Sequence, residues 1–233
     1  MRKAERFQRF LEYFTTHFPE PETELQYGSP YELIVAVVLS AQCTDKRVNQ
    51  ITPELFRQFP TPAHLAAATA DDIFPLIRSV SYPNNKAKHL AGLGRLLVEE
   101  FNSEVPSNLD DLQRLPGVGR KTANVVMSVI YNQPAMAVDT HVFRVSHRLG
   151  LVSKSATTPL AVEKELVRYI PTELIPKAHH WLILHGRYIC VARTPKCAVC
   201  PLTSICAYYA RQVAPLLENL PSLPSAPKMP PQA

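Results

Sequence analysis

Apolar side chains recur at helical spacing along most of the chain. Near its start, Phe7, Phe10, Leu11, Phe14 and Phe18 fall three or four residues apart, which is typical of one face of an amphipathic helix. The same periodicity, interrupted by Pro, Asn, Ser and Gly, predicts helices at 46–58, 62–68, 71–79, 85–101, 108–114, 120–131, 141–149, 159–169 and 176–190. Strand signals are weak, so we expect an all-α protein.

The clearest helix start lies at Ser29. This residue is suited to the N-cap, Pro30 to the first helical position, and Glu32 to closing a capping box. An uninterrupted apolar run follows at 33–39. The composition of this run would also suit a strand, but the cap before it favours a buried helix.

Composition narrows the class of protein only a little. The 233 residues, 46% hydrophobic and 19% charged, suffice for one large domain or two smaller lobes. A formal net charge of +5 suits nucleic-acid binding and, equally, mere solubility. No segment resembles a signal peptide, and no run approaches the roughly 18 apolar residues of a membrane span. We therefore expect an intracellular protein without a membrane partner.

Four of the five cysteines lie close together near the C-terminus. Cys190, Cys197, Cys200 and Cys206 have the spacing C-x6-C-x2-C-x5-C within 17 residues, so that their thiolates could surround one metal centre. Zinc is the alternative, although zinc ribbons usually hold two C-x-x-C pairs and this loop has one. Structural disulfides are rare inside cells. Cys43 stands apart and is expected to be a small core thiol.

The cysteine segment is also basic. Arg187, Arg193 and Lys196 lie beside or between the cysteines and could face a phosphate backbone, as well as simply being solvated.

A glycine-rich segment, Leu115–Lys121, separates two predicted helices. Gly117 and Gly119 allow a tight turn, and their amides, with those that open the next helix, can point at a phosphate. Leu115 and Val118 would hold the hairpin against the core. The similar segment at 90–95 lacks the proline, and its leucines continue a helical period, so we expect a helix there.

These motifs, taken together and in order, resemble the endonuclease III family of DNA glycosylases. The resemblance runs from about residue 25 to 210 and rests on the hairpin, the four cysteines and the segments Leu39–Asp45, Val138–Arg144 and His179–Gly186. It implies a two-lobed helix-hairpin-helix fold: a six-helix barrel at 23–133, and an iron–sulfur domain formed by 1–22 and 134–213 that carries a [4Fe–4S] cluster. The proline-rich tail, 214–233, is expected to be disordered.

The resemblance assigns the chemistry to two residues. Lys121 would attack sugar C1′ and form a Schiff base, because a helix start and a partly desolvated cleft both favour the neutral amine. From the residues alone, a phosphate-binding lysine is an equal reading. Asp139 would stabilise positive charge at C1′ or assist proton transfer, and it is also a good N-cap for the helix that follows.

The remaining site residues follow the same resemblance with weaker support. Gln42 would enter the duplex near the vacated base, and Ser40, Asp45 and His141 are candidates for the pocket. The segment 81–86 corresponds to a loop that the family resemblance expects to wedge into DNA. Here Ser81 and Pro83 replace the glycine and the tyrosine that are usual in the family. Pro83 should bias Tyr82 toward an extended backbone. Tyr82 would then wedge into the base stack or merely pack on the surface. Residues expected to touch DNA are Gln42, Tyr82, Gly117, Val118, Gly119, Arg120, Arg187, Arg193 and Lys196.

The implied activity is base-excision repair of oxidised pyrimidines. A monomer at the nucleoid or in the cytoplasm would remove the damaged base from double-stranded DNA and cleave 3′ to the abasic site. Two alternatives remain. One is the sister adenine-DNA glycosylase, which generally lacks the hairpin lysine and carries a further domain. The other is a non-catalytic DNA-binding module that uses the same hairpin.

Overall fold

The computed structural model describes residues 1–218 and contains only helices and loops in that range. Short 3-10 segments and one π-helical turn, Tyr209–Val213, complete the path. The α-helices are α1 (Lys3–His17), α2 (Pro30–Ser40), α3 (Asp45–Gln58), α4 (Pro62–Ala67), α5 (Ala70–Ile77), α6 (Pro83–Glu100), α7 (Leu109–Arg114), α8 (Arg120–Val129), α9 (Thr140–Leu149), α10 (Pro159–Tyr169), α11 (Ile175–Tyr188) and α12 (Ala214–Glu218). The all-α prediction is confirmed for the described residues, and each predicted helix occurs within about two residues of its expected ends.

The start of α2 follows the prediction with one change. Ser29 Oγ accepts a hydrogen bond from the Glu32 N–H at 3.2 Å, as an N-cap should. The Glu32 carboxylate, however, accepts from the N–H of Gly28 at 2.6 Å and not from that of Ser29. The reciprocal bond of the expected capping box is therefore shifted by one residue.

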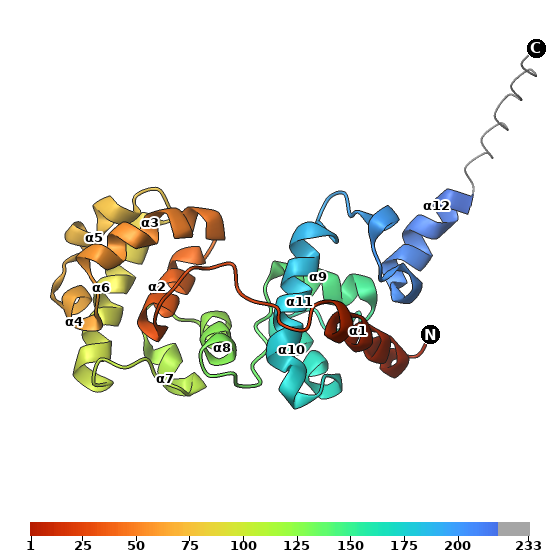
Figure 1. Cartoon of the computed structure of the whole chain (residues 1–233), viewed down its shortest axis with the longest axis horizontal. Helices are drawn as coiled ribbons and strands as arrows, with labels where there is room; N and C mark the ends of the chain where they lie inside the picture. The colour runs from red at the N-terminus through yellow and green to blue at the C-terminus, as the bar shows by residue number, and fades with distance from the viewer. Residues whose placement is uncertain (219–233) are drawn as a thin grey trace, which may run out of the picture.

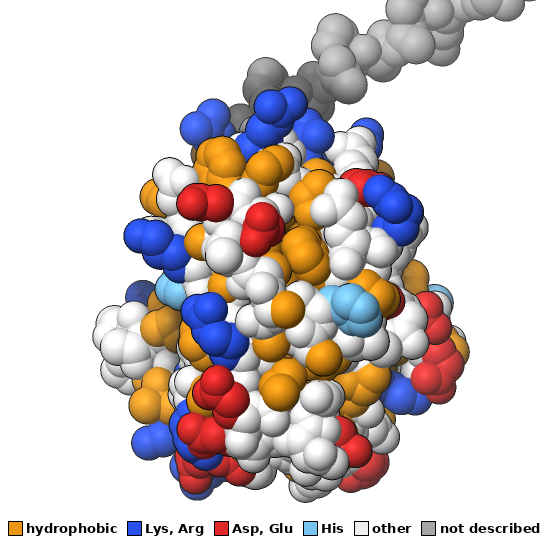
Figure 2. Space-filling view, turned by 90° about the vertical axis from the view of Figure 1, so that its left-hand side faces the viewer, with side chains coloured by type: hydrophobic (Ala, Val, Ile, Leu, Met, Phe, Trp, Pro, Cys, Tyr) orange, Lys and Arg blue, Asp and Glu red, His pale blue; other side chains and the backbone are white. Residues whose placement is uncertain are grey.

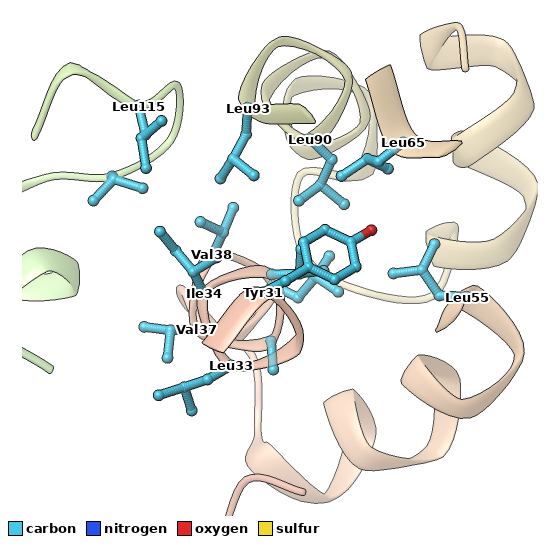
Figure 3. Close-up of a cluster of buried hydrophobic side chains, with 14 of the residues drawn as sticks. Tyr31, Leu33, Ile34, Val37, Val38, Leu55, Leu65, Leu90, Leu93 and Leu115 are labelled. Carbon is cyan, nitrogen blue, oxygen red and sulfur yellow. The ribbon is translucent and has the colours of Figure 1, made fainter. Parts of the chain in front are cut away.

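The helices form two lobes, seen side by side in Figure 1. The first, which we call the hairpin lobe, comprises α2 to α8 and has α2 at its centre. Every residue from Leu33 to Leu39 is buried, and Figure 3 shows α2 side chains meeting leucines of α3, α4 and α6. Since each fully buried Leu or Ile stabilises the fold by roughly 1.5–3 kcal/mol, this one helix organises the lobe.

The second lobe, the cysteine lobe, joins α1 to α9 and the helices that follow it. Phe14 of α1 stacks on Trp181 of α11 with ring centroids 5.5 Å apart. The indole N–H of Trp181 donates to the Phe18 carbonyl at 2.7 Å. The chain therefore starts in this lobe, crosses to the hairpin lobe through the linker before α2, and returns after α8.

The glycines of segment 90–95 lie inside α6, as predicted. A Cβ at Gly94 would lie 2.7 Å from the backbone nitrogen of Ala66, so α4 and α6 cross at a distance that only glycine permits. A Cβ at Gly92 would lie 3.1 Å from Cγ of Pro116. The proline of the glycine hairpin thus rests on α6.

Substitution of Gly94 by alanine is expected to destabilise the protein by about 1–3 kcal/mol, because the added methyl group overpacks two helix backbones. This cost outweighs the helix-propensity gain of about 1 kcal/mol. Urea unfolding measures the difference. Gly92→Ala, which meets only side-chain atoms of Pro116, is the matched control with a smaller loss. A Gly94→Ala protein as stable as the wild type would contradict the close crossing.

The start of the proline-rich tail differs from the sequence prediction. Residues 214–218 form α12 and continue the π-helical turn before it, whereas disorder was expected from 214 onward. Pro215 lies inside this helical run, which extends without a break from 207 to 218. The remainder of the predicted tail, 219–233, lies outside the described residues.

The outer end of the hairpin lobe carries charges of both signs. Figure 2 views this end directly and shows Lys and Arg side chains interspersed with Asp and Glu, with apolar groups between them. Because this end displays no continuous basic surface, it is not an evident site for a polyanion. None of the helices in the described range has the length and apolar character that a membrane crossing requires.

Candidate active site

The segment Leu115–Lys121 forms a tight hairpin between α7 and α8. Gly117 has a φ angle of 81°, in the left-handed region that favours glycine. Leu115 and Val118 are buried and hold the hairpin to the lobe. Gly119 is the N-cap of α8. Since both glycines are exposed, the amides here can face a phosphate.

One pocket lies between the two lobes and gathers five of the predicted residues, namely Ser40, Asp45, Lys121, Asp139 and Arg187. Ser40 lines it from the end of α2, Asp45 from the start of α3, Lys121 from the first turn of α8, and Asp139 from the N-cap of α9. Linker residues 22–25 and α11 side chains between His179 and Arg187 complete the wall. The pocket therefore exists only because the chain returns to the cysteine lobe after α8.

Lys121 and Asp139 occupy two helix starts that open onto this pocket. Lys121 is exposed, so the expected desolvation of its amine would require DNA to cover the cleft. Asp139 Oδ1 accepts from the N–H groups of His141 and Val142, both at 2.8 Å. Neither bond uses Oδ2, which leaves that oxygen for the pocket.

Two histidines of α11 also line the pocket. His179 is buried, its Nδ1 lies 3.0 Å from the Ala137 carbonyl oxygen, and burial is the main cause that lowers its pKa to about 3. Burial, and then the charge of Arg187, lowers the pKa of His180 to about 4. Both rings are therefore neutral near pH 7.

Arg187 lies inside the pocket and not on the surface of the basic loop. Its guanidinium pairs with Asp45 at 2.6 Å and with Glu24 of the linker. Tyr188 also donates its hydroxyl to Glu24. Arg187 is thus already paired with two carboxylates in this structure, whereas the sequence predicted that it would face a phosphate backbone. Sequence reasoning missed Glu24 because a single carboxylate in a linker carries no periodic signal.

The hairpin arginine is paired as well. Two of the guanidinium nitrogens of Arg120, Nε and Nη2, donate to the Glu163 carboxylate of α10, at 3.0 and 2.5 Å. This pair ties the hairpin to the cysteine lobe. Arg193 and Lys196 are exposed, and no ion pair within residues 1–218 involves them, so these two remain available to a phosphate backbone.

Gln42, Tyr82 and His141 do not line the pocket. Gln42 and Tyr82 are exposed on two turns beyond the ends of α2 and α5, and Ser81 Oγ donates to the Gln42 carbonyl at 2.6 Å. The Cβ of His141 approaches Gly186 of α11, and its Nδ1 lies 3.2 Å from Nη2 of Arg144.

Tyr82 departs from the predicted extended backbone. Its φ and ψ angles are 55° and 49°, in the left-handed region. The ring of Pro83 excludes mainly the right-handed helical region for the preceding residue, and the turn into α6 uses the left-handed alternative. The prediction was therefore wrong in conformation, although the side chain is exposed, with 61% of its surface accessible.

Tyr82→Ala is expected to weaken binding to lesion-containing duplex by about tenfold, the low end of the roughly 1–3 kcal/mol that stacking on an aromatic side chain contributes. Binding to single-stranded lesion DNA should change much less, since no base stack has to be opened there. Fluorescence anisotropy on both substrates makes the comparison. Equal losses would assign Tyr82 to the fold and not to duplex opening.

The four clustered cysteines line one pocket beside the end of α11. Arg148 Nη1 lies 3.5 Å from Cys190 Sγ, and the Tyr209 N–H donates to Cys206 Sγ at 3.4 Å. Such donors stabilise thiolates, so this set of four sulfurs fits a metal–sulfur centre.

Two protein-family models match this chain, and each covers residues of one of the two sites. The family model for the HhH-GPD superfamily of base excision DNA repair proteins matches residues 35–172. The model for the iron–sulfur binding domain of endonuclease III matches residues 190–206, the stretch that begins and ends with the outer two cysteines. Among the described features, the first match spans the hairpin and Asp139.

Curated relatives and solved structures point to the same family as these two models. The chain is 45% identical over 207 residues to endonuclease III of Rickettsia conorii, covering 89% of this chain and 98% of the relative. It is 48% identical to endonuclease III of Bacillus subtilis, over 81% and 86% of the two chains. A trapped endonuclease III–DNA covalent intermediate matches with a TM-score of 0.84 and 44% identity, over 89% and 97%. The chain therefore belongs to the endonuclease III family of base-excision repair DNA glycosylases, with an iron–sulfur-binding C-terminal domain.

Proposed function

We propose that this glycosylase is bifunctional: it removes oxidised pyrimidines from duplex DNA and then cleaves 3′ to the abasic site. The observation that carries the proposal is the placement of Lys121 and Asp139 at two helix starts that open onto one interlobe pocket. The covalent DNA intermediate named for a solved relative supports covalent chemistry in a site of this kind.

The reaction begins with the Lys121 amine. Its nitrogen forms a bond to C1′, the glycosidic bond breaks, and the base leaves with the electron pair and takes up a proton. Opening of the sugar ring yields a protonated Schiff base. Loss of a proton from C2′ then expels the 3′ phosphate by β-elimination, and water releases the lysine. The lyase step therefore requires an amine at this position.

Asp139 supports this chemistry through its charge. The α9 N–H groups hold Oδ1, so the carboxylate is fixed beside the place where positive charge develops at C1′. Oδ2 can also accept a proton from the attacking amine or the sugar. The neutral His179 and His180 add no competing charge to the same wall.

The partner is duplex DNA that contains a damaged base or an abasic site, bound by a monomer. The amides of the hairpin and the exposed Arg193 and Lys196 would contact phosphates across the cleft. The Arg187 pair with Asp45 and Glu24 would present both donors and acceptors to a flipped base.

The iron–sulfur group is proposed to be a [4Fe–4S] cluster held by Cys190, Cys197, Cys200 and Cys206. Protein purified without oxygen should be brown and contain about four irons and four acid-labile sulfides per chain. Cys197→Ser should lower both, whereas Cys43→Ser, outside the loop, should not. Stoichiometric zinc without labile sulfide would contradict the assignment.

Strand cleavage tests the proposed activity. A 5′-labelled duplex with one oxidised pyrimidine should break without alkali and end in a 3′ unsaturated aldehyde. A break that requires alkali would reduce the enzyme to base removal, as in the sister adenine-DNA glycosylases. Binding without base release would instead indicate a non-catalytic module.

A further inference from the structure

The turns that carry Gln42 and Tyr82 are strained and directly joined. Both residues have a φ angle of 55°, where a side chain other than glycine costs roughly 1–2 kcal/mol. Such conformations persist where neighbouring contacts fix them. The hydrogen bond from Ser81 Oγ to the Gln42 carbonyl, at 2.6 Å, is one of those contacts. It connects residues 39 positions apart in sequence.

A buried lysine also holds the chain next to Gln42 and Tyr82. Lys86 of α6 is only 5% exposed, and its Nζ donates to the carbonyls of Leu39 and Ala41, both at 2.7 Å. These carbonyls belong to the last turn of α2 and to its C-cap, where no helical partner remains for them. The Lys86 N–H also bonds the Tyr82 carbonyl at 3.1 Å. One residue therefore holds the Gln42 turn through its side chain and the Tyr82 turn through its backbone.

Ser81 is the member of this group that departs from the family pattern. The family loop usually opens with glycine at this position, and glycine has no hydroxyl group to donate. The link between the two turns is thus made by the hydroxyl group of Ser81. Because Gln42 and Tyr82 are exposed, the link orders their backbones and leaves both side chains free to reach outward.

We propose that Ser81 is a positioning residue that locks the Gln42 and Tyr82 turns together, so that the two side chains enter lesion-containing duplex as one unit. This inference rests on the proposed function, since it assumes that both residues enter DNA. It implies that each side chain contributes more when the other is present. The expected coupling is about fivefold in affinity, which corresponds to the net free energy that one ordinary intramolecular hydrogen bond contributes.

A double-mutant cycle tests the proposal. In full-length protein made inert by Lys121→Gln, the dissociation constant for lesion duplex is measured for Gln42→Ala, Tyr82→Ala and the double variant. We expect the loss of affinity in the double variant to be about fivefold smaller than the product of the two single losses. In an added Ser81→Ala background, the losses should multiply without coupling. Ser81→Thr, which keeps a hydroxyl, should restore it.

Two results would overturn the inference: coupling that survives Ser81→Ala, or losses that already multiply in the Ser81 protein. A Ser81→Ala protein that melts at the wild-type temperature excludes loss of fold as the cause of lost coupling. Adduct formation by the wild-type enzyme on abasic DNA reports on the proposed function separately. A wild type that forms the adduct but shows no Ser81-dependent coupling contradicts this inference alone.

Discussion

Replacement of Lys121 by glutamine is expected to lower covalent adduct formation with abasic DNA by about a thousandfold or more, and to leave DNA binding nearly unchanged. Glutamine has a similar length and polarity, but its amide nitrogen does not add to C1′. Lys121 is exposed in the first turn of α8, so its removal should cost little stability. Borohydride reduction followed by a denaturing gel measures the adduct.

A surface lysine provides the matched control for this result. Lys154 is exposed in the cysteine lobe and does not line the pocket, so Lys154→Gln should trap DNA like the wild type. Normal trapping by Lys121→Gln would show that another amine carries the reaction, and Lys121 would then be a phosphate contact.

Replacement of Asp139 by asparagine is expected to slow base release by about a hundredfold or more, with most of the DNA affinity retained. Asparagine is as good an N-cap as aspartate, so the bonds to the α9 N–H groups can persist while the charge is lost. Single-turnover release of an oxidised pyrimidine measures the rate.

Asp139→Ser separates the two roles of this residue. Serine also caps helices well but, like asparagine, lacks the carboxylate, so both variants should be stable and slow. If both kept the wild-type rate, Asp139 would be a helix cap and no more. If Asp139→Asn were slow only because it unfolded, its melting temperature would reveal that directly.

Much of this molecule can be read from its sequence because the signals are local. The apolar run at 33–39 and the cap at Ser29 specify α2, and the spacing of four cysteines specifies one loop. Gly117 requires a left-handed turn, which places Lys121 at a helix start. Each of these features depends on residues within a few positions of one another.

The features that the sequence did not predict depend on contacts between residues far apart in the chain. Nothing near Arg187 in the sequence indicates that Glu24 and Asp45 will pair with it across two lobes. The left-handed Tyr82 contradicted a rule about the residue before proline, because its turn is held by Ser81 and Lys86 against the end of α2. Helix α12 was missed because proline content was taken as evidence of disorder, whereas residues 214–218 continue the helical turn before them.

The most direct measurement is to locate the covalent bond in the wild-type enzyme. A duplex with a single abasic site is incubated with the enzyme and reduced with borohydride, and the adduct is digested and mapped by mass spectrometry. We predict that the sugar remnant is attached to Nζ of Lys121 alone. Attachment to another lysine or to the N-terminal amine, or the absence of any adduct while binding persists, would contradict the account.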